Sequence, residues 1–299
     1  MRKILVTGGT TFVSRGVAQH FMALGDEVWV LNRGNREQVS GVHHIKADRH
    51  SLGKSLERLA FDAVLDVTAY TGEDVKCLLS SLGDFGVYVL VSSSAVYPET
   101  EKQPFTEKTP VGRNSLWGEY GTNKIAAETC LRKNCENYYI LRPPYLYGEG
   151  ENLYREPFVF DCALRDRVFA LPQSDMKLQF FYVKDLCRFM DVLISERPEE
   201  RVYNVGNPET VSVKKWVTLC YEALGKSPKF TVAEKHHPIR DYFCFYDYDY
   251  ALSVKRMRSL MPEVTPLCEG LKNTAEWYRD NADSVLKKPY TDYIDRFIR

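Results

Sequence analysis

The sequence predicts an α/β protein in which helices cover both faces of a doubly wound parallel sheet, with a smaller lobe after it. Short apolar runs alternate along the first half with segments in which apolar residues recur every three or four positions, the spacing of an amphipathic helix. Most of the apolar runs are continuous, as is usual for strands buried on both faces of a parallel sheet. Because strands alternate with helices, right-handed crossovers between parallel strands are expected.

The elements of the first half can be placed from these patterns. Residues 3–8, "KILVTG", are expected to form the first strand and residues 12–24 the helix after it, with Gly25 at the position where a glycine commonly ends a helix. The remaining strands of this half are expected over residues 27–33, 43–48, 62–70, 86–97 and 138–148.

The pattern loosens in the second half. Residues 202–207, "VYNVGN", predict a strand that returns to the sheet, and residues 214–225 predict a helix. After Pro289 aromatic and aliphatic residues recur at helical spacing, which indicates a helix docked on its own domain. The predicted division is a first domain over residues 1–150, joined by the strand near 202–207, and a smaller lobe over residues 151–299. Ligands of such folds bind outside the C-terminal ends of the strands, between the two lobes.

The composition is that of an ordinary globular protein. Of the 299 residues, 44% are hydrophobic and 27% are charged, and 40 basic side chains balance 40 acidic ones. The zero formal net charge argues against a nucleic-acid partner, since proteins that bind nucleic acids usually carry a basic excess.

Membrane and metal classes are not indicated. No apolar run is long enough to span a bilayer, and the first strand begins at Lys3, which leaves no room for a signal peptide. The eight cysteines are scattered without a C-x-x-C pair, so reduced and mostly buried thiols are expected. Neither His43-His44 nor His236-His237 has a cysteine or carboxylate at ligand spacing. We therefore expect a cytoplasmic protein without a metal.

A glycine-rich turn follows the first strand. Residues 7–16 read "TGGTTFVSRG", and in a strand–turn–helix unit the backbone N–H groups of such a turn face an incoming phosphate. Gly8 and Gly9 supply the tight bend, whereas Thr11 and Ser14 stand where the usual pattern has glycines. Serine is the smallest replacement, but a β-branched threonine resists a positive φ. The turn residues expected to bind a dinucleotide are Gly8, Thr10, Thr11, Phe12 and Val13.

The end of the second strand bears on which dinucleotide binds. A carboxylate at this place accepts hydrogen bonds from the ribose hydroxyls of NAD, but this chain has Asn32, followed by Arg33 and, three residues on, Arg36. The loss of the negative charge and the gain of two arginines favour binding of the 2′-phosphate of NADP. Asn32 can also hydrogen-bond a plain ribose, so NAD stays an alternative to the preferred NADP.

A tyrosine and a lysine four residues apart carry the clearest chemistry. Tyr120 and Lys124 share one face of a predicted helix, and a nearby ammonium lowers the pKa of a phenol so that it can exchange a proton near neutral pH. The preceding strand ends in three serines, of which Ser93 or Ser94 could bond the same substrate oxygen as Tyr120.

These residues and their order resemble the extended short-chain dehydrogenase/reductases, also called the NAD-dependent epimerase/dehydratase family, which have a Rossmann fold. The resemblance rests on the glycine turn, Asp48 at the end of the third strand, and the segments "SSSAVY", "YGTNK", "LRPPYLYGEG", "FFYVKDL", "VYNVGNPE", "IRDYFCF" and "EGLKNTAEWY". They cover nearly the whole chain. The "GGTxF" form of the turn is similar to an atypical branch that includes the chloroplast stem-loop-binding proteins.

The resemblance implies a role for each matching residue. Tyr120 would be the catalytic acid/base, Lys124 would tune its pKa and hold the nicotinamide ribose, and Ser93, four residues before the tyrosine of "VY", would be the active-site serine. Besides Lys124, further cofactor contacts are implied for Asp48, Ala69, Pro143 and Tyr145. Substrate contacts are implied for Ser94, Asn152, Lys177 and Arg240. An arginine that often grips the diphosphate is replaced by Leu178, so this clamp is incomplete.

The residues after Ser93 narrow the reaction. Ser94 and Ala95 stand where the dehydratases of the family have an Asp-Glu pair, so dehydration is not expected. The favoured function is C4 epimerisation of a nucleotide sugar through a transient keto sugar, with NAD or NADP. Two alternatives stay open: an NADP-dependent reductase or dehydrogenase of a sugar or other carbonyl compound, and a non-catalytic module that binds a dinucleotide or RNA. The resemblance also implies a homodimer.

Overall fold

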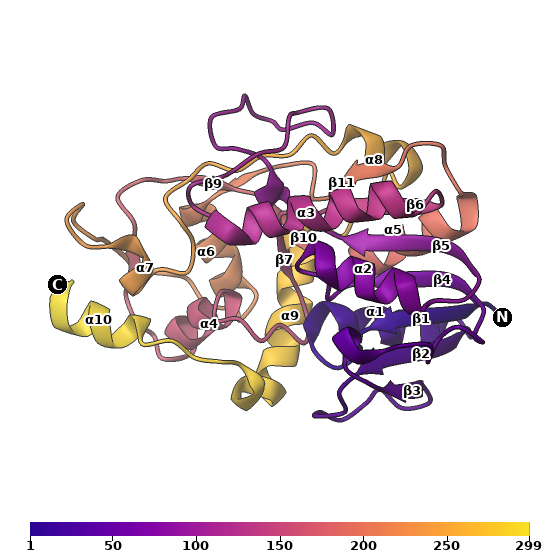
Figure 1. Cartoon of the computed structure of the whole chain (residues 1–299). Coiled ribbons are helices and arrows are strands. Elements are labelled where there is room, and N and C mark those ends of the chain that lie inside the picture. The colour runs from indigo at the N-terminus through magenta and orange to yellow at the C-terminus, as the bar shows by residue number, and fades with distance from the viewer. Residues whose placement is uncertain (299) are drawn as a thin grey trace. The chain divides into compact units, whose positions relative to one another are not determined.

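The computed structural model describes residues 1–298 and divides into two compact units, each built from several stretches of chain (Figure 1). The first unit comprises Met1–Pro144, Val183–Gly206 and Leu252–Val264. The second comprises Tyr145–Tyr182, Asn207–Ala251 and Thr265–Arg299. The first unit thus ends before the boundary expected at residue 150, and it takes back more chain than the one returning strand expected near 202–207.

A seven-stranded sheet forms the centre of the first unit, with the order β11-β6-β5-β4-β1-β2-β3. Every neighbouring pair is parallel, and the sheet runs outward in both directions from β1. The expected α/β class with a doubly wound parallel sheet is therefore confirmed. The strands are β1 (Lys3–Thr7), β2 (Glu27–Asn32), β3 (His43–Lys46), β4 (Phe61–Asp66), β5 (Phe85–Val91), β6 (Tyr138–Arg142) and β11 (Val202–Asn204).

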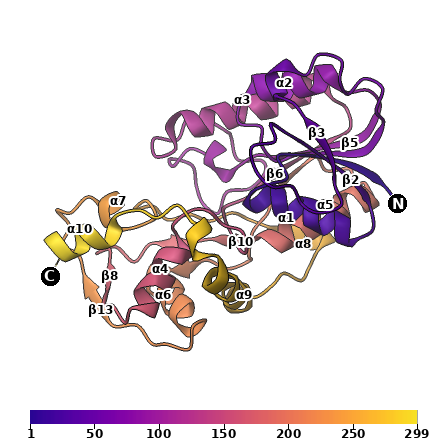
Figure 2. The ribbon, with the colours of Figure 1, turned by 90° about the horizontal axis from the view of Figure 1, so that it is seen from below.

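Helices cover both faces of this sheet (Figure 2). On one face α1 (Phe12–Ala23) packs beside α5 (Val183–Glu196), and on the other α2 (Gly72–Ser81) packs beside α3 (Gly118–Asn134). The short helix α8 (Lys255–Leu260) lies beside the edge strand β11. With both faces covered, the strands are apolar throughout, which is why continuous apolar runs predicted them.

The core under α2 and α3 holds the sheet and these helices together. Leu5, Val64 and Leu90 from neighbouring strands are fully buried, as are Leu78 of α2 and Leu131 of α3. Each such side chain stabilises the fold by about 1.5–3 kcal/mol relative to an exposed position. This packing fixes α3, and with it the predicted catalytic pair, against the sheet.

Three of the expected strands end well before the predicted residue, and the one expected over 62–70 ends at Asp66 as β4. The strand expected over residues 138–148 is two strands, β6 in the first unit and β7 (Tyr145–Tyr147) in the second. Pro143 and Pro144 separate them because proline has no N–H to donate to a ladder. The strand expected over 86–97 ends at Val91, and the serines after it lead into the 3₁₀ turn η2 (Ser94–Val96).

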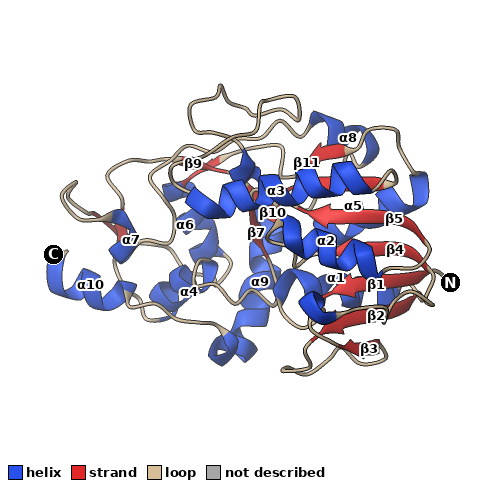
Figure 3. Ribbon diagram, in the orientation of Figure 1, coloured by secondary structure: helices blue, strands red, loops and turns tan. Residues whose placement is uncertain are grey.

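The second unit is smaller and built mainly of helices (Figure 3). Helices α4, α6 and α9 pack on one another, and α10 packs on α7. The ring of Tyr290 in α10 stacks on the ring of Tyr154, with the ring centres 6.0 Å apart. The helix predicted after Pro289 therefore docks on its own unit. The helices are α4 (Glu156–Leu164), α6 (Val213–Glu222), α7 (Ile239–Tyr242), α9 (Leu267–Asn281) and α10 (Tyr290–Phe297). The short strand pairs are β7 with β10 (Phe180–Tyr182), β8 (Phe169–Leu171) with β13 (Phe230–Val232), and β9 (Lys177–Leu178) with β12 (Val211–Ser212).

Across residues 1–298, every helix is too short or too polar to span a membrane.

Candidate active site

The turn after β1 has the tight backbone that its glycines predict. Gly8 and Gly9 have φ values of 89° and 80°, in the region that favours glycine. Thr11 is extended, with φ −141°, so its β-branched side chain meets no backbone strain here. The residue with positive φ is instead Phe12, at 39°, at the first position of α1. The turn therefore follows a path in which threonine is acceptable and phenylalanine is strained.

Close packing at the turn explains why Gly8 is needed and why Ser14 is tolerated. A Cβ atom at Gly8 would lie 2.8 Å from Cγ2 of Thr68 and 2.9 Å from Oγ of Ser14. Ser14 is buried, and its hydroxyl donates to the carbonyl of Thr11 at 3.0 Å. Serine thus fits between the helix and the turn with its polar atom satisfied.

The first turn of α1 is suited to an anionic group. Thr11 makes no side-chain capping bond, and the first turn carries no acidic residue. The backbone N–H groups of the first turn of α1 and the positive end of the helix dipole are therefore available to a phosphate. A glycine cradle that a Cβ would fill, together with this uncapped helix start, fits the pyrophosphate of a dinucleotide.

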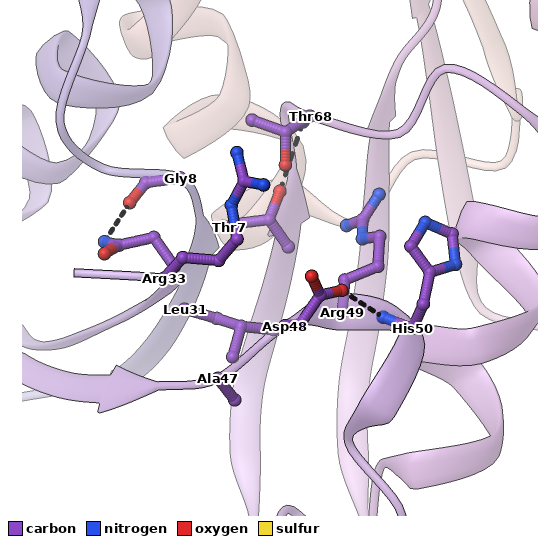
Figure 4. Close-up of a pocket in the computed structure, with 10 residues that line it drawn as sticks. Thr7, Gly8, Leu31, Arg33, Ala47, Asp48, Arg49, His50 and Thr68 are labelled. Atoms are coloured by element: carbon purple, nitrogen blue, oxygen red, sulfur yellow. Dashed lines mark hydrogen bonds between the residues drawn. The ribbon is translucent and has the colours of Figure 1, made fainter. Parts of the chain in front are cut away.

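A pocket of about 320 Å³ lies at the C-terminal ends of the strands around β1 (Figure 4). It is lined by Thr7, Gly8, Leu31, Asn32, Arg33, Ala47, Asp48, Arg49, His50 and Thr68. The pocket thus brings together Gly8, Asn32, Arg33 and Asp48, which the sequence predicted as cofactor residues. The other lining residues lie at the ends of neighbouring strands or in the turn after β3, and no motif in the sequence singled them out.

The side chain of Asn32 holds neighbouring backbone segments together through hydrogen bonds. Its Nδ2 donates to the carbonyl of Gly8 at 2.6 Å and to Oε1 of Gln38 at 2.8 Å, and its Oδ1 accepts from the backbone N–H of Gly34 at 2.8 Å. The amide therefore ties the glycine turn to the loop after β2. Its neighbour Arg33 is exposed and places a guanidinium at the pocket.

Asp48 and the two residues after it form the other side of the pocket. The Asp48 carboxylate accepts from the backbone N–H of His50 at 2.9 Å and so caps the 3₁₀ turn η1 (Arg49–Ser51). Figure 4 shows Asp48, Arg49 and His50 together on this side. The side chain of Asp48 stays exposed.

A buried carboxylate that sequence reasoning missed joins these parts. Asp66, at the end of β4, is fully buried and accepts from Thr7 Oγ1 at 2.7 Å, from Arg49 Nη2 at 2.6 Å and from the hydroxyl of Tyr88. Burial, and then the Asp66 charge, hold the pKa of Tyr88 well above its usual value, so Tyr88 stays a donor. Asp66 therefore fixes the floor of the pocket. The available signal was a charged residue ending an otherwise apolar strand.

The predicted catalytic pair lies on the first turns of α3. Tyr120 is 39% exposed, whereas Lys124 is buried and its Nζ donates to the carbonyls of Ala69 at 2.8 Å and Val91 at 2.9 Å. Nζ lies 5.9 Å from the centre of the Tyr120 ring. Burial lowers the pKa of Lys124 to about 8. The partly exposed phenol of Tyr120 thus stands beside a cation held in place by two backbone carbonyls.

The two candidate serines differ in how their hydroxyls are used. Ser93 is half-buried, and its Oγ accepts from the N–H of Ala95 at 3.1 Å, a bond that does not use the hydroxyl proton. Ser94 is buried, and its Oγ donates to the carbonyl of Pro143 at 2.7 Å. Ser93 is therefore the better donor to a substrate oxygen, whereas Ser94 and the buried Pro143 hold the ends of β5 and β6 together.

A buried ion pair anchors α3 one turn beyond Lys124. Glu128 accepts from Arg142 Nη2 at 2.5 Å and from Ser92 Oγ at 2.6 Å, and Arg142 Nη1 donates to the hydroxyl of Tyr97 at 2.8 Å. Although burial opposes ionisation, the Arg142 guanidinium keeps the pKa of Glu128 below its usual value. The pair joins α3 to the ends of β5 and β6 and was not singled out from sequence.

The predicted substrate residues Asn152, Lys177 and Arg240, and the predicted cofactor residue Tyr145, lie in the second unit. Lys177 is exposed on β9, and its backbone N–H donates to Asp249 at 2.8 Å. The Arg240 guanidinium lies 4.8 Å from the centre of the Tyr246 ring and donates to the carbonyl of Phe243 at 3.3 Å.

The other two are held differently. The carbonyl of Asn152 accepts from the N–H of Leu286 at 3.1 Å, so its backbone is tied to the segment after α9. The Tyr145 ring lies 4.5 Å from that of Phe245, and burial raises the pKa of Tyr145 well above its ordinary value. Leu178, which replaces the expected arginine, is fully buried.

Nine of the predicted cofactor residues do not line the pocket: Thr10, Thr11, Phe12, Val13, Arg36, Ala69, Lys124, Pro143 and Tyr145. Arg36 is exposed on the loop after β2, and its carbonyl accepts from Gln38. Ala69 is buried, and its carbonyl holds Lys124. Among residues 1–298, no group of three or more His, Cys, Asp or Glu side chains is arranged to hold a metal ion.

The parallel sheet, the glycine turn and the uncapped helix after it define an α/β protein of the doubly wound, Rossmann type. Residues 74–206 match the family model of the NAD dependent epimerase/dehydratase family. This match confirms the resemblance seen in the sequence over the matched segment. The matched segment includes Ser93, Tyr120 and Lys124 and begins after the glycine turn.

Similar proteins include sugar-nucleotide enzymes and a protein named for stem-loop binding. The chain is 26% identical to the chloroplast stem-loop binding protein of 41 kDa b from Arabidopsis thaliana, over 91% of this chain and 78% of that protein. It is 26% identical to UDP-glucose 4-epimerase from Corynebacterium glutamicum, over 75% of this chain and 80% of that enzyme. The solved structure of the enzyme WbmH from Bordetella bronchiseptica, in complex with NAD⁺, has the same fold, with a TM-score of 0.75, 16% identity and coverage of 94% and 99%.

Proposed function

We propose that this protein is an NAD(P)-dependent epimerase of a nucleotide sugar that inverts C4 through a transient keto sugar. The observation that carries the proposal is the arrangement on α3, where an exposed Tyr120 stands beside a buried Lys124 held by two backbone carbonyls. This arrangement suits proton transfer at a sugar hydroxyl. The similarity to UDP-glucose 4-epimerase supports the substrate class.

Each residue has a stated task in this proposal. Tyr120 takes the proton from the C4 hydroxyl of the sugar and returns it to the C4 oxygen when the hydroxyl is restored. The charge of Lys124 stabilises the phenolate form of Tyr120. Ser93 donates a hydrogen bond to the same oxygen and orients it. A nicotinamide bound at this site would supply the hydride-transfer chemistry at C4. Because the turn and pocket fit a dinucleotide, Gly8, Arg33 and Asp48 would hold it.

The preference between cofactors follows from charge at the pocket. Asn32 brings no negative charge and is engaged with Gly8 and Gln38, while Arg33 beside it is exposed at the lining. An exposed guanidinium next to Asn32, where a carboxylate would otherwise end the strand, favours the 2′-phosphate of NADP. WbmH is solved with NAD⁺, which supports NAD as the alternative.

The sugar nucleotide would be held by residues of the second unit. Arg240 and Lys177 carry the positive charges suited to a diphosphate, and Asn152 offers an amide. Since Leu178 is buried and apolar, the diphosphate would have fewer arginine contacts than an arginine at this position would give.

A reductase or dehydrogenase is the second candidate. The same Ser93, Tyr120 and Lys124 serve a net reduction, and an NADP preference suits a reductase better than an enzyme that recycles its cofactor. A binding module without activity is the third, supported by the similarity to the stem-loop binding protein. The zero net charge counts against RNA binding.

Compartment and assembly are further parts of the proposal. The cysteines are unpaired among the described residues, which suits the reducing cytoplasm. A homodimer formed through two helices of the first unit, one of them the helix that bears Tyr120, is inferred from the family resemblance. Light scattering of the purified chain at several concentrations tests the dimer.

The cofactor content of the purified protein tests the proposed function. The protein is denatured and removed, and NAD(H) and NADP(H) are quantified in the supernatant. Near-stoichiometric cofactor supports an epimerase that recycles a captive dinucleotide. An empty protein whose melting temperature rises with NADP supports the reductase, by linkage to a ligand of the native state. An empty protein indifferent to both contradicts the epimerase and the reductase.

A further inference from the structure

Tyr70 lies beside the catalytic pair without a task in the function proposed above. It follows Ala69, whose carbonyl holds Lys124, and it is 56% exposed. The centre of its ring lies 4.9 Å from Nζ of Lys124 and 6.4 Å from the centre of the Tyr120 ring. A large aromatic side chain is thus kept at the surface next to the two groups that carry the chemistry.

The position of Nζ makes the ring of Tyr70 a binding partner of the ammonium. Lys124 gives two hydrogen bonds, to the carbonyls of Ala69 and Val91, which leaves one N–H of the ammonium for its aromatic neighbours. Nζ is nearer to the ring centre of Tyr70, at 4.9 Å, than to that of Tyr120, at 5.9 Å. Both distances are within the range of about 6 Å over which a cation is attracted to an aromatic face.

The charged groups around Lys124 do not supply this contact in another way. Asp66 at the end of β4, Asp74 of α2 and Glu128 of α3 favour the charged ammonium, whereas Arg49 of η1 opposes it. Asp66 is already bonded to Arg49, and Asp74 and Glu128 are likewise engaged with other donors. Burial meanwhile disfavours the charge. The ring face of Tyr70 lies close to Nζ and can stabilise the charged ammonium. No other role is assigned to this ring.

We propose that Tyr70 is a positioning residue whose ring face keeps the Lys124 ammonium charged and close to Tyr120. It acts through Lys124 and requires the aromatic ring, not the hydroxyl. The catalytic meaning of this contact rests on the proposed function, while the contact itself is a property of the free protein.

Two substitutions separate the ring from the hydroxyl. Tyr70→Phe keeps the ring, and Tyr70→Leu keeps an apolar side chain that shields Lys124 from water but has no aromatic face. The full chain is labelled with ¹³C at the lysine side chains, and the pKa of Lys124 is measured by NMR titration, with the resonance assigned from Lys124→Arg. Tyr70→Phe is expected to match the wild type, and Tyr70→Leu to lower the pKa of Lys124 by about 0.5–1 pH unit.

Each outcome decides the proposal. An unchanged pKa in Tyr70→Leu overturns it, and so does an equal fall in Tyr70→Phe, because the hydroxyl would then be the acting group. Thermal unfolding of both variants checks that they fold, which is expected because Tyr70 is exposed. If the pKa falls in Tyr70→Leu but the wild type converts no sugar nucleotide, the contact stands and only the proposed function fails.

Discussion

Replacing Lys124 by methionine is expected to change how the stability of the protein depends on pH. Burial lowers the pKa of Lys124 from its ordinary value of 10.5 to about 8. At neutral pH the folded protein therefore carries a charged group in a place that disfavours the charge. Methionine has a similar length without the charge, so the variant lacks this dependence.

The size and sign of the effect follow from proton linkage. Between pH 8 and pH 10.5 the unfolded lysine keeps a proton that the folded lysine has lost, so the free energy of unfolding rises with pH across this window. The cost of the charge is fully present below pH 8 and amounts to about 3 kcal/mol over the whole window. Because other groups titrate in both proteins, the informative quantity is the difference between wild type and Lys124→Met.

Urea unfolding of both proteins at about pH 7, 8, 9 and 10 measures this difference in the free energy of unfolding. The wild type should gain about 2–3 kcal/mol relative to Lys124→Met between the lowest and highest pH. A difference that stays constant over this range would refute the reasoning, since it would mean that Lys124 titrates at the same pH in the folded and unfolded chains.

Three further substitutions test the cofactor turn, the cofactor preference and the anchor of α3. Gly9→Ala should weaken dinucleotide binding and lower the melting temperature, because the new Cβ would lie 2.6 Å from a methyl group of Val30. Gly25→Ala is the control for backbone strain alone, since Gly25 has a similar φ and open space around it. Arg33→Ala should weaken NADP binding about tenfold or more in calorimetry, with a smaller effect on NAD; equal losses would sink the NADP preference. Glu128→Gln should lower the free energy of unfolding by about 3–5 kcal/mol, because it breaks the buried pair with Arg142. Arg132→Ala removes the more exposed partner of Glu128 and should lower it by less than about 1 kcal/mol. Similar losses in the two variants would contradict a buried anchor.

Local sequence patterns were sufficient for most of the fold. The strands on either side of the glycine turn are continuous apolar runs because both faces of the sheet are covered, and this burial is visible in the sequence. The strand over 138–148 was wrong in one respect, since Pro143 ends one strand and the chain begins another in a different sheet. A resemblance to a family could not show that, because the break depends on which unit each segment joins.

The candidate site was predictable where its groups are close in sequence. Tyr120 and Lys124 are one helical turn apart, so their shared face follows from helix geometry. Asp66 was missed because its donors Thr7 and Arg49 lie 59 and 17 residues away. The strain at Phe12, where threonine was expected to be the difficult residue, depends on the path of the turn rather than on residue preference. Tyr70 was missed since its contact with Lys124 forms only when α3 packs on the sheet.

The most direct test of the central claim compares the wild type with Tyr120→Phe on a panel of UDP- and dTDP-hexoses. Inversion at C4 is followed by NMR of the anomeric proton with NAD⁺ or NADP⁺ present, and cofactor affinity is measured on the same samples. We expect the wild type to invert one of these sugars and Tyr120→Phe to lose about 10²–10⁴-fold in turnover with nearly unchanged cofactor affinity. Equal turnover by the two proteins, or no conversion of any sugar by a wild type that binds the cofactor, would contradict it.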